Sequence, residues 1–169
     1  MQYLFFKQDL VPLHWQLFSC APAPEFGGQF RASNTLVLGA KFDTIDYKQV
    51  IPALLELAPT INELIAHGSE IPFSEYVEIL VKSHHRLTVI HPFGDGNGRT
   101  LRAFFNLLLM RRGLLPIYIK VENKTEYTDT LSQADMDGTF DKLYAVIAKA
   151  ILRAQAELSE TPPLYSNNS

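Results

Sequence analysis

The sequence predicts an all-α domain with one small β element. Apolar residues recur at helical spacing in five separate segments between residues 46 and 158. One run, residues 35–38, has the composition of a strand. The chain has 169 residues, of which 47% are hydrophobic and 20% charged, so it is large enough for a globular domain with its own core. We therefore expect a single domain over residues 1–169.

The first 26 residues are expected to form an irregular lead-in, because Pro12, Pro22 and Pro24 interrupt them. One short helix fits near residues 8–19. The segment has no basic stretch followed by an uninterrupted apolar run, so we expect no signal peptide.

Residues 30–42 differ in character from the lead-in. They contain the strand-like run Thr35–Leu38, and Gly39 and Ala40 can then turn the chain back. This pattern predicts a small hairpin or an extended edge, and an ordinary loop is the alternative.

Two helices are predicted before the middle of the chain. The first covers residues 46–66, where Pro59 should kink or split it, and His67-Gly68 should end it. The second covers residues 74–88, with Ser74 as a plausible N-cap. Pro92 then forces the helix to end, because its ring clashes with a helical residue before it.

The strongest helical pattern covers residues 98–112 and has a wide apolar stripe, with Gly113 suited to its C-terminal cap. Two further helices are predicted over residues 124–135 and 138–158. Residues 160–169 are polar and rich in proline, so we expect a frayed tail.

Charge and composition narrow the class of protein. The net charge is −3 and the isoelectric point is about 5.9, which argues against a general nucleic-acid or membrane binder. No apolar stretch reaches the length that a membrane span needs. Cys20 is the single cysteine, so it cannot form an internal disulfide, and we expect it to be a small buried residue. These features predict a cytoplasmic protein.

The segment HPFGDGNGRTLR, residues 91–102, carries the strongest chemical signal. Its glycine-rich turn, Gly94–Gly98, can curl successive N–H groups around an anion. The turn leads directly into a helix N-terminus, which also favours anions. Arg99 and Arg102 lie on one face of that helix, and Asn106 continues the face one turn later. The pattern predicts a polyphosphate site.

Two further residues of this segment suit phosphate chemistry. Asp95 is a lone carboxylate beside the predicted phosphates, as is usual for Mg²⁺. His91 titrates near neutral pH, so it can accept a proton from a hydroxyl that attacks phosphorus. Phe93 is expected to anchor the turn in the core.

Several other classes of binding site are inconsistent with the residues of this segment. A calcium-binding EF-hand loop that begins at Asp95 would place Arg99 and Asn106 at ligand positions. A dinucleotide-binding fingerprint needs a preceding strand and a third glycine, and a P-loop needs Gly-Lys-Ser/Thr. A metal pair of His91 and Asp95 on one helix face is excluded by Pro92 and the glycines.

Residues 91–102 resemble the complete signature of the Fic family, with every diagnostic position filled. The resemblance extends over roughly residues 27–150, including GGQFRASNTLVLG, VKSHHRLTVI and EYTDTLSQAD. It implies a helical bundle of the Fic/Doc type with a small β-hairpin flap. The flap, near Asn34–Lys41, would hold the hydroxyl-bearing segment of a target protein by strand addition.

The resemblance also implies roles for single residues, with ATP and Mg²⁺ as cofactors. It makes His91 the general base and Asp95 the Mg²⁺ ligand, with Tyr127 or Leu131 bordering the adenine. The phosphates would be bound by the remaining motif residues, Gly96, Asn97, Gly98, Arg99 and Arg102.

The activity implied is transfer of AMP from Mg·ATP to a Ser, Thr or Tyr hydroxyl of a target protein. Gly98 stands where the kinase-like Doc branch has lysine, and this small residue favours the AMP-transferring branch. Transfer of another nucleotide or of phosphocholine is the main alternative. A non-catalytic nucleotide-binding module and a nucleic-acid-binding helical domain are further alternatives.

Many Fic proteins are inhibited by a Ser/Thr-x-x-x-Glu-Gly/Asn helix. Ser74 and Glu78 have the required spacing, but Ile79 follows and the segment reads as a core helix. We therefore expect either a separate small antitoxin, which would make this chain a toxin, or no control of this kind.

Overall fold

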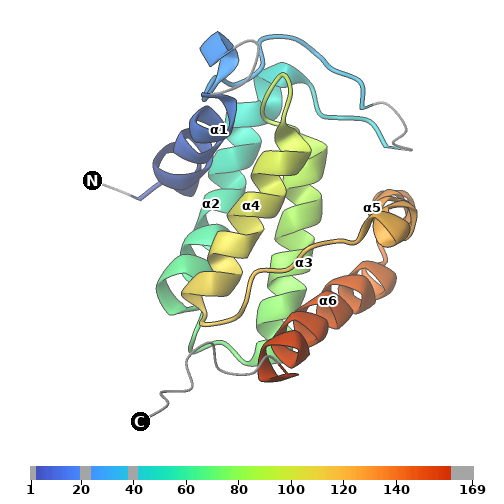
Figure 1. Ribbon diagram of the computed structural model, residues 1–169. Helices are drawn as coiled ribbons and strands as arrows, with labels where there is room; N and C mark the ends of the chain where they lie inside the picture. The colour runs from blue at the N-terminus through green and yellow to red at the C-terminus, as the bar shows by residue number, and fades with distance from the viewer. Residues whose placement is uncertain (1–2, 20–23, 38–41, 161–169) are drawn as a thin grey trace.

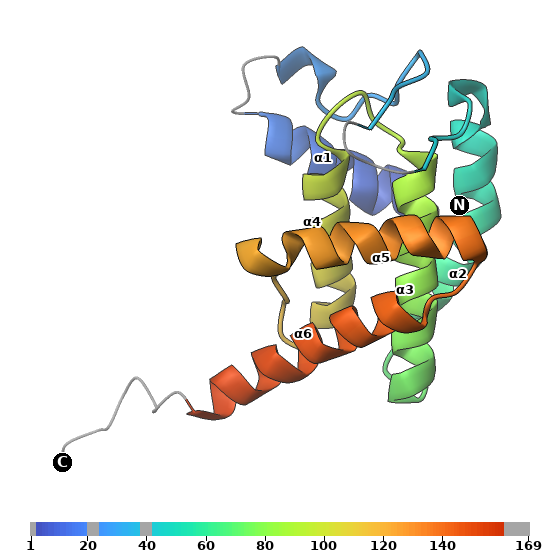
Figure 2. The same ribbon diagram turned by 90° about the vertical axis from the view of Figure 1, so that its right-hand side faces the viewer.

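The protein is described by a computed structural model at residues 3–19, 24–37 and 42–160. Three long helices, α2 (Val50–His67), α3 (Phe73–Ile90) and α4 (Asn97–Arg111), pack side by side. Figure 1 shows α1 (Val11–Phe18) beside the bundle. In Figure 2, α5 (Lys124–Asp137) and α6 (Asp141–Glu160) cross another side. The predicted all-α class is confirmed.

Four short helical turns complete the described secondary structure: η1 (Phe6–Leu10), η2 (Pro24–Phe26), η3 (Tyr47–Gln49) and η4 (Val121–Asn123). None of the described helices is long and apolar enough to cross a membrane.

The predicted β element is reduced to a single contact. Within the described residues, Phe30 forms an isolated antiparallel bridge with Phe93, and no strand is present. Residues 34–37 and 42–45 are extended arms without strand pairing, and the turn between them, residues 38–41, lies outside the described residues. The Thr44 hydroxyl donates to the Thr35 carbonyl at 2.7 Å, so the two arms lie close together near their base.

Two expectations about helix boundaries are wrong. Pro59 does not split α2, which continues through it. Residues on both sides of it, Leu54 and Ile61, are fully buried, and their packing outweighs the lost backbone hydrogen bond. Ser74 is not the N-cap of α3, because Pro72 occupies that position with an extended backbone and no side-chain cap. The predicted helix end at His67-Gly68 is confirmed.

The end of α4 follows the expected glycine cap. Gly113 has a left-handed backbone with φ of 82°. Its N–H donates to the Met110 carbonyl at 2.9 Å, and the Leu114 N–H donates to the Leu109 carbonyl at 3.0 Å. This is the pairing of a Schellman motif, which satisfies the last carbonyls of the helix.

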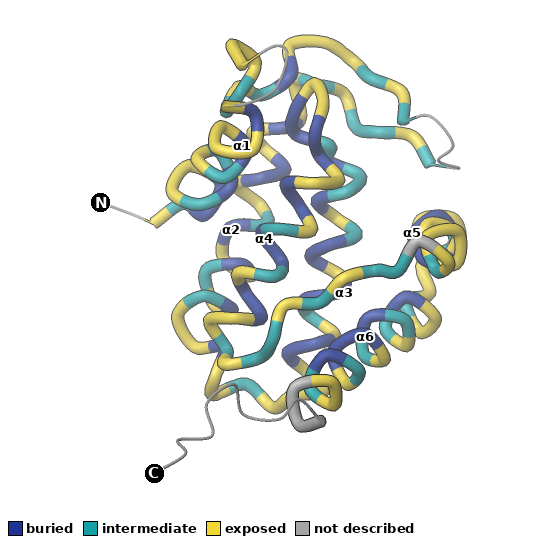
Figure 3. Tube along the Cα trace, in the orientation of Figure 1, coloured by how far each residue is buried: buried dark blue, intermediate teal, exposed yellow. Residues whose placement is uncertain are grey.

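The N-terminal segment is more than an irregular lead-in. Phe5, Phe6 and Leu10 are fully buried, and Phe5 stacks on Phe104 of α4. Figure 3 shows buried positions of this segment against the bundle. A helix was expected near residues 8–19, and α1 confirms it. Two other expectations, on Cys20 and on the tail, concern positions outside the described residues except for residue 160, which ends α6.

Candidate active site

The turn between α3 and α4 is closed by one buried side chain. The Asn97 amide donates to the Phe93 carbonyl at 2.8 Å, and its oxygen accepts the Phe93 N–H at 2.9 Å. Asn97 is only 2% exposed, so its side chain cannot also bind phosphate. Its contribution to an anion site is limited to its backbone N–H at the start of α4. Phe93 is fully buried, as the sequence predicts.

Gly96 is required by the shape of this turn. It is the N-cap of α4 with a left-handed φ of 72°. A Cβ atom there would lie 2.3 Å from Cε2 of Phe18, so no larger residue fits. Gly98 differs, because it is exposed and its Cβ would meet only the flexible end of Arg102, at 3.1 Å.

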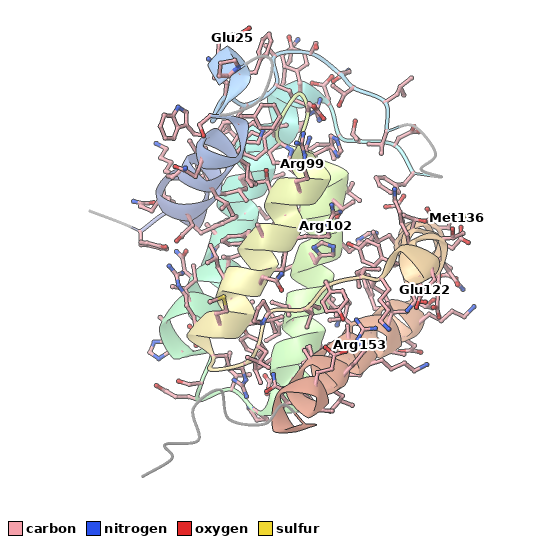
Figure 4. All side chains as sticks on the ribbon, in the orientation of Figure 1. Glu25, Arg99, Arg102, Glu122, Met136 and Arg153 are labelled. Atoms are coloured by element: carbon pink, nitrogen blue, oxygen red, sulfur yellow. The ribbon has the colours of Figure 1, made fainter. Side chains whose placement is uncertain are left out.

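The two motif arginines lie on exposed positions of the first turns of α4 (Figure 4). The Arg99 guanidinium lies over the Phe18 ring and 3.6 Å from a carboxylate oxygen of Asp95. Arg102 has no carboxylate within ion-pair distance among the described residues. The N-terminus of α4 therefore presents two guanidinium groups together with the unpaired N–H groups of a helix start.

Arg102 and the start of α4 border a cavity of about 230 Å³, whereas Asp95, Gly96 and Arg99 do not line it. It is bounded by the motif, by α3 and α5, and by the arms on either side of residues 38–41. The sequence-predicted residues that line it are His91, Asn97, Gly98, Arg102, Tyr127 and Leu131. Thus the structure brings two α5 residues to the motif, although they are far from it in sequence.

His91 is held at the mouth of this cavity by an unusual backbone. It is the one non-glycine residue with positive φ, 48°, within the described part of the chain. Its Nδ1 lies 3.4 Å from the Thr88 carbonyl. A proton on Nδ1 satisfies that carbonyl and leaves Nε2 as the acceptor.

Burial lowers the pKa of His91, and Arg31 acts in the same direction, whereas the Thr88 carbonyl and Asp95 raise it. The imidazole is therefore neutral at pH 7, which is the state that a general base needs.

Asp95 is exposed and still has coordinating capacity. One of its oxygens accepts the Gly96 N–H at 2.6 Å, and the other makes only the long contact with Arg99. No cluster of three or more acidic, His or Cys side chains suitable for a metal occurs in the described ranges. A single carboxylate fits Mg²⁺ only when phosphates and water supply the other ligands.

A model of the Fic/DOC family matches residues 5–109 of this chain. The chain belongs to the Fic/DOC family. Protein adenylyltransferase Fic of Nematostella vectensis is 44% identical over 131 residues, which cover 75% of this chain and 28% of that protein. The protein of the same name from Aedes aegypti is 30% identical over 171 residues, 96% of this chain and 32% of that protein. The chain spans less than a third of the length of these relatives.

Solved structures show the same Fic fold. Fic-1 from C. elegans superposes with a TM-score of 0.72 at 25% identity, over 91% of this chain and 44% of that chain. The BepC protein of Bartonella tribocorum, solved with bound AMPPNP, gives a TM-score of 0.69 at 21% identity, over 83% of this chain and 71% of that chain. At this identity the likeness to BepC shows the fold alone.

The side chain of Asn106 does not join those of Arg99 and Arg102. The Asn106 amide donates to the Ile117 carbonyl at 2.9 Å, and its oxygen accepts the Ile117 N–H at 2.8 Å. The sequence placed Asn106 on the face of Arg99 and Arg102, but its side chain fastens the segment after α4.

His14 supports the motif turn and was missed by the sequence reasoning. Its ring is buried and stacks on Phe93 with 3.8 Å between centroids. The Gly28 N–H donates to Nδ1 at 2.8 Å, so the proton resides on Nε2, which lies 3.0 Å from the Asp95 carbonyl. No local pattern reveals this role, because its partners lie 14 and 81 residues away.

Replacing His14 by alanine should destabilise the Fic domain by about 2–4 kcal/mol, because a buried ring loses its packing and two part-buried backbone groups lose their hydrogen-bond partner. Urea unfolding measures the change. Gln16→Ala, at an exposed position of the same helix, should stay within about 0.5 kcal/mol of the original protein. Equal stability of the two variants would contradict the role given to His14.

His84 and Tyr127 form a buried hydrogen-bonded pair beside Arg102. Burial lowers the pKa of His84 to about 3, and the charges of Arg102 and His85 act in the same direction. Burial raises the pKa of Tyr127 to about 12, so its hydroxyl stays protonated. The pair fixes the Tyr127 ring at the cavity wall in an uncharged state.

The fold should lose stability in mild acid because of His84. The unfolded chain binds a proton on this residue below its ordinary pKa of 6.5, whereas the folded chain does so only near 3. Stability is therefore lost as pH falls below 6.5, by about 2 kcal/mol between pH 7 and pH 5. Urea unfolding at both pH values should show a smaller loss in His84→Gln. An identical loss in both proteins would refute the assignment.

Proposed function

We propose that this Fic domain is a protein adenylyltransferase that moves AMP from Mg·ATP to a hydroxyl side chain of a target protein. One observation carries the proposal: the neutral imidazole of His91 opens on the same cavity as Arg102 and the N-terminal turn of α4. The names of the curated relatives, protein adenylyltransferases, support the same reaction.

The step balances with these groups. The target hydroxyl oxygen attacks the α-phosphorus of ATP, and the bond between that phosphorus and the bridging oxygen breaks. Nε2 of His91 takes the hydroxyl proton, and pyrophosphate leaves. The N–H groups of Asn97 and Gly98 and the forks of Arg99 and Arg102 would hold the phosphate charge. Gly96 would contribute through the shape of the turn, because its N–H donates to Asp95.

Asp95 would hold Mg²⁺, which neutralises phosphate charge when it is bound. Tyr127 and Leu131 would border the adenine, since both line the cavity next to Arg102. The exposed Gly98 leaves the start of α4 open to the α-phosphate.

The target would dock on the arms around residues 38–41, as an added strand. Leu36 is 86% exposed on the first of these arms, which provides an apolar contact for an entering peptide. The predicted flap, Asn34–Lys41, has its last four residues outside the described part of the chain.

Control by a separate antitoxin is also part of the proposal. Ser74 and Glu78 lie in the first turns of α3, and Glu78 pairs with Lys82 on the surface. About 18 Å of helix separates Glu78 from the motif end of α3. An inhibitory glutamate would therefore have to come from elsewhere.

Labelled nucleotides test the proposal. The protein is incubated with a cell lysate and ATP labelled at either the α- or the γ-phosphate. Label retained on a protein from the α-position alone supports AMP transfer, and mass spectrometry then identifies the modified residue. Retention of γ-label would refute it, and transfer from UTP, GTP or a phosphocholine donor instead would favour the alternative donors. ATP binding without any labelled protein would favour a non-catalytic module.

A further inference from the structure

Arg31 is a buried cation whose side chain is directed to the backbone. The residue is 6% exposed. Its Nε donates to the His91 carbonyl at 2.8 Å, and Nη1 donates to the Ser33 carbonyl at 3.0 Å. Nη2 donates to the carbonyls of Ile45 and Ile90, the latter at 3.3 Å.

No carboxylate forms an ion pair with Arg31 among the described residues. The negative charge of Asp46 acts on Arg31 without forming an ion pair with it. Burying a cation without such a pair is costly, so carbonyl dipoles replace the water that the guanidinium has lost. Two of these carbonyls, of Ile90 and His91, lie at the C-terminal end of α3, where the helix dipole favours a cation. The guanidinium thus donates hydrogen bonds to the last carbonyls of α3, the helix that ends next to His91.

The other two carbonyls belong to the start and the end of the segment 33–45. The same ends are joined by further hydrogen bonds, and the Asn34 side-chain oxygen also accepts one from Nη1 of Arg31 at 3.5 Å. Asn34 accepts the Tyr47 N–H at 2.8 Å and donates to Asp46 at 3.3 Å, and the Ile45 N–H donates to the Val89 carbonyl at 3.2 Å. Figure 1 shows the described parts of this segment, residues 33–37 and 42–45, passing over the end of the bundle at which α3 ends and α4 begins.

The planar side chain of Arg31 therefore bridges three backbone regions. They are His91 at the end of α3, the start of the segment 33–45 and the end of that segment. The backbone N–H of Arg31 donates to a fifth carbonyl, that of Pro92, at 2.9 Å. His91 has a left-handed backbone, which costs about 1–2 kcal/mol in a non-glycine residue, so it needs fixed partners on its own carbonyl.

We infer that Arg31 is a positioning residue that holds His91 in fixed register with the arms that receive the target. The inference rests on the proposed function for its catalytic meaning, because the arms matter only if a target docks on them. Lysine cannot replace it, since an ammonium lacks the planar fork that reaches carbonyls on several sides.

The test compares Arg31→Gln and Arg31→Lys with the original protein. Both variants should lower the single-turnover rate of transfer by about 10- to 100-fold, because a small displacement of base from target is sufficient for such a loss. The dissociation constant for Mg·ATP should change little, since Arg31 does not border the cavity that holds the phosphates. If Arg31→Gln does not fold, the transfer rate and the dissociation constant are compared for Arg31→Lys and the original protein alone.

Arg112→Gln is a matched control. Arg112 also donates to a backbone carbonyl, that of Ile71, at 2.7 Å, but at the opposite end of the bundle. It should lose stability and keep the full rate of transfer. If the Arg31 variants transfer AMP as fast as Arg112→Gln, the inference is wrong.

A second measurement does not need activity. NMR titration of His91 reports its pKa in each protein, with Arg31 and Asp95 as the charges that act on it and Arg102, His84 and Tyr127 as the other titratable groups around the cavity. The pKa should rise in Arg31→Gln and rise less in Arg31→Lys. An unchanged pKa in both variants would overturn the placement of Arg31 beside the base. If the original protein transfers no nucleotide while this pKa shift is seen, the proposed function fails and the placement stands.

Discussion

Replacing His91 by asparagine should reduce the rate of AMP transfer by about 10²- to 10⁴-fold, the usual contribution of a general base. Asparagine tolerates the left-handed backbone that His91 adopts, whereas alanine would add strain. It cannot take up a proton at neutral pH, so the variant removes the base and keeps the turn. A single-turnover assay at saturating Mg·ATP measures this loss.

The same variant should bind ATP as tightly as the original protein. His91 is neutral at pH 7, because burial lowers its pKa, and so adds no charge to the phosphate site. Calorimetric titration checks this point. His67→Ala, an exposed histidine at the end of α2, is the control and should transfer AMP at the full rate. Undiminished transfer by His91→Asn would remove this residue from the mechanism.

Replacing Arg102 by alanine should weaken ATP binding by about 10- to 100-fold, because charge-assisted hydrogen bonds contribute about 1.5–3 kcal/mol. Arg102 lines the cavity and has no carboxylate partner within the described residues, so its fork is available for phosphate. The loss should appear in the dissociation constant for Mg·ATP. The loss of affinity should be smaller for AMP, because AMP lacks the outer phosphates.

Arg111→Ala gives the comparison for this prediction. Arg111 lies on the same helix, at its other end, and pairs with Asp9 at 2.9 Å. The Asp9 side chain is only 11% exposed, so loss of this ion pair should lower stability, but it should leave ATP affinity within about twofold. Equal effects of the two substitutions on affinity would mean that the phosphates do not bind at the start of α4.

The placement of the motif residues could be predicted from the sequence because they are neighbours in the chain. The glycine-rich turn leads into α4 as predicted, and Arg99 and Arg102 share its exposed side. Asp95 and His91 also lie at this turn. Local spacing determines such features, since turn geometry and helix periodicity act over a few residues.

The supporting contacts could not be predicted, because they join residues that are distant in sequence. His14 reaches the motif turn from α1, and Arg31 reaches His91 across 60 positions. The side-chain amide of Asn97 pairs with the backbone of Phe93, which leaves only its backbone N–H for the predicted phosphate role. In each of these cases a buried polar side chain forms hydrogen bonds with backbone groups, and the pattern of a single sequence does not specify such partners.

At Pro59 the local sequence carries a clear signal, but tertiary packing outweighs it. The proline ring predicts a break in the helix, yet α2 continues through it because the flanking apolar residues are packed in the core. Tertiary packing contributes more than the local penalty, so helix propensity alone misplaces the boundary.

The central claim is that the turn before α4 holds a triphosphate with its α-phosphorus facing His91. A crystal structure of the protein with Mg²⁺ and a non-hydrolysable ATP analogue measures this directly. The account predicts phosphate oxygens on the N–H groups at the start of α4 and on Arg102, with Nε2 of His91 turned toward the α-phosphate. Phosphates bound elsewhere, or an imidazole turned away from that phosphorus, would contradict it.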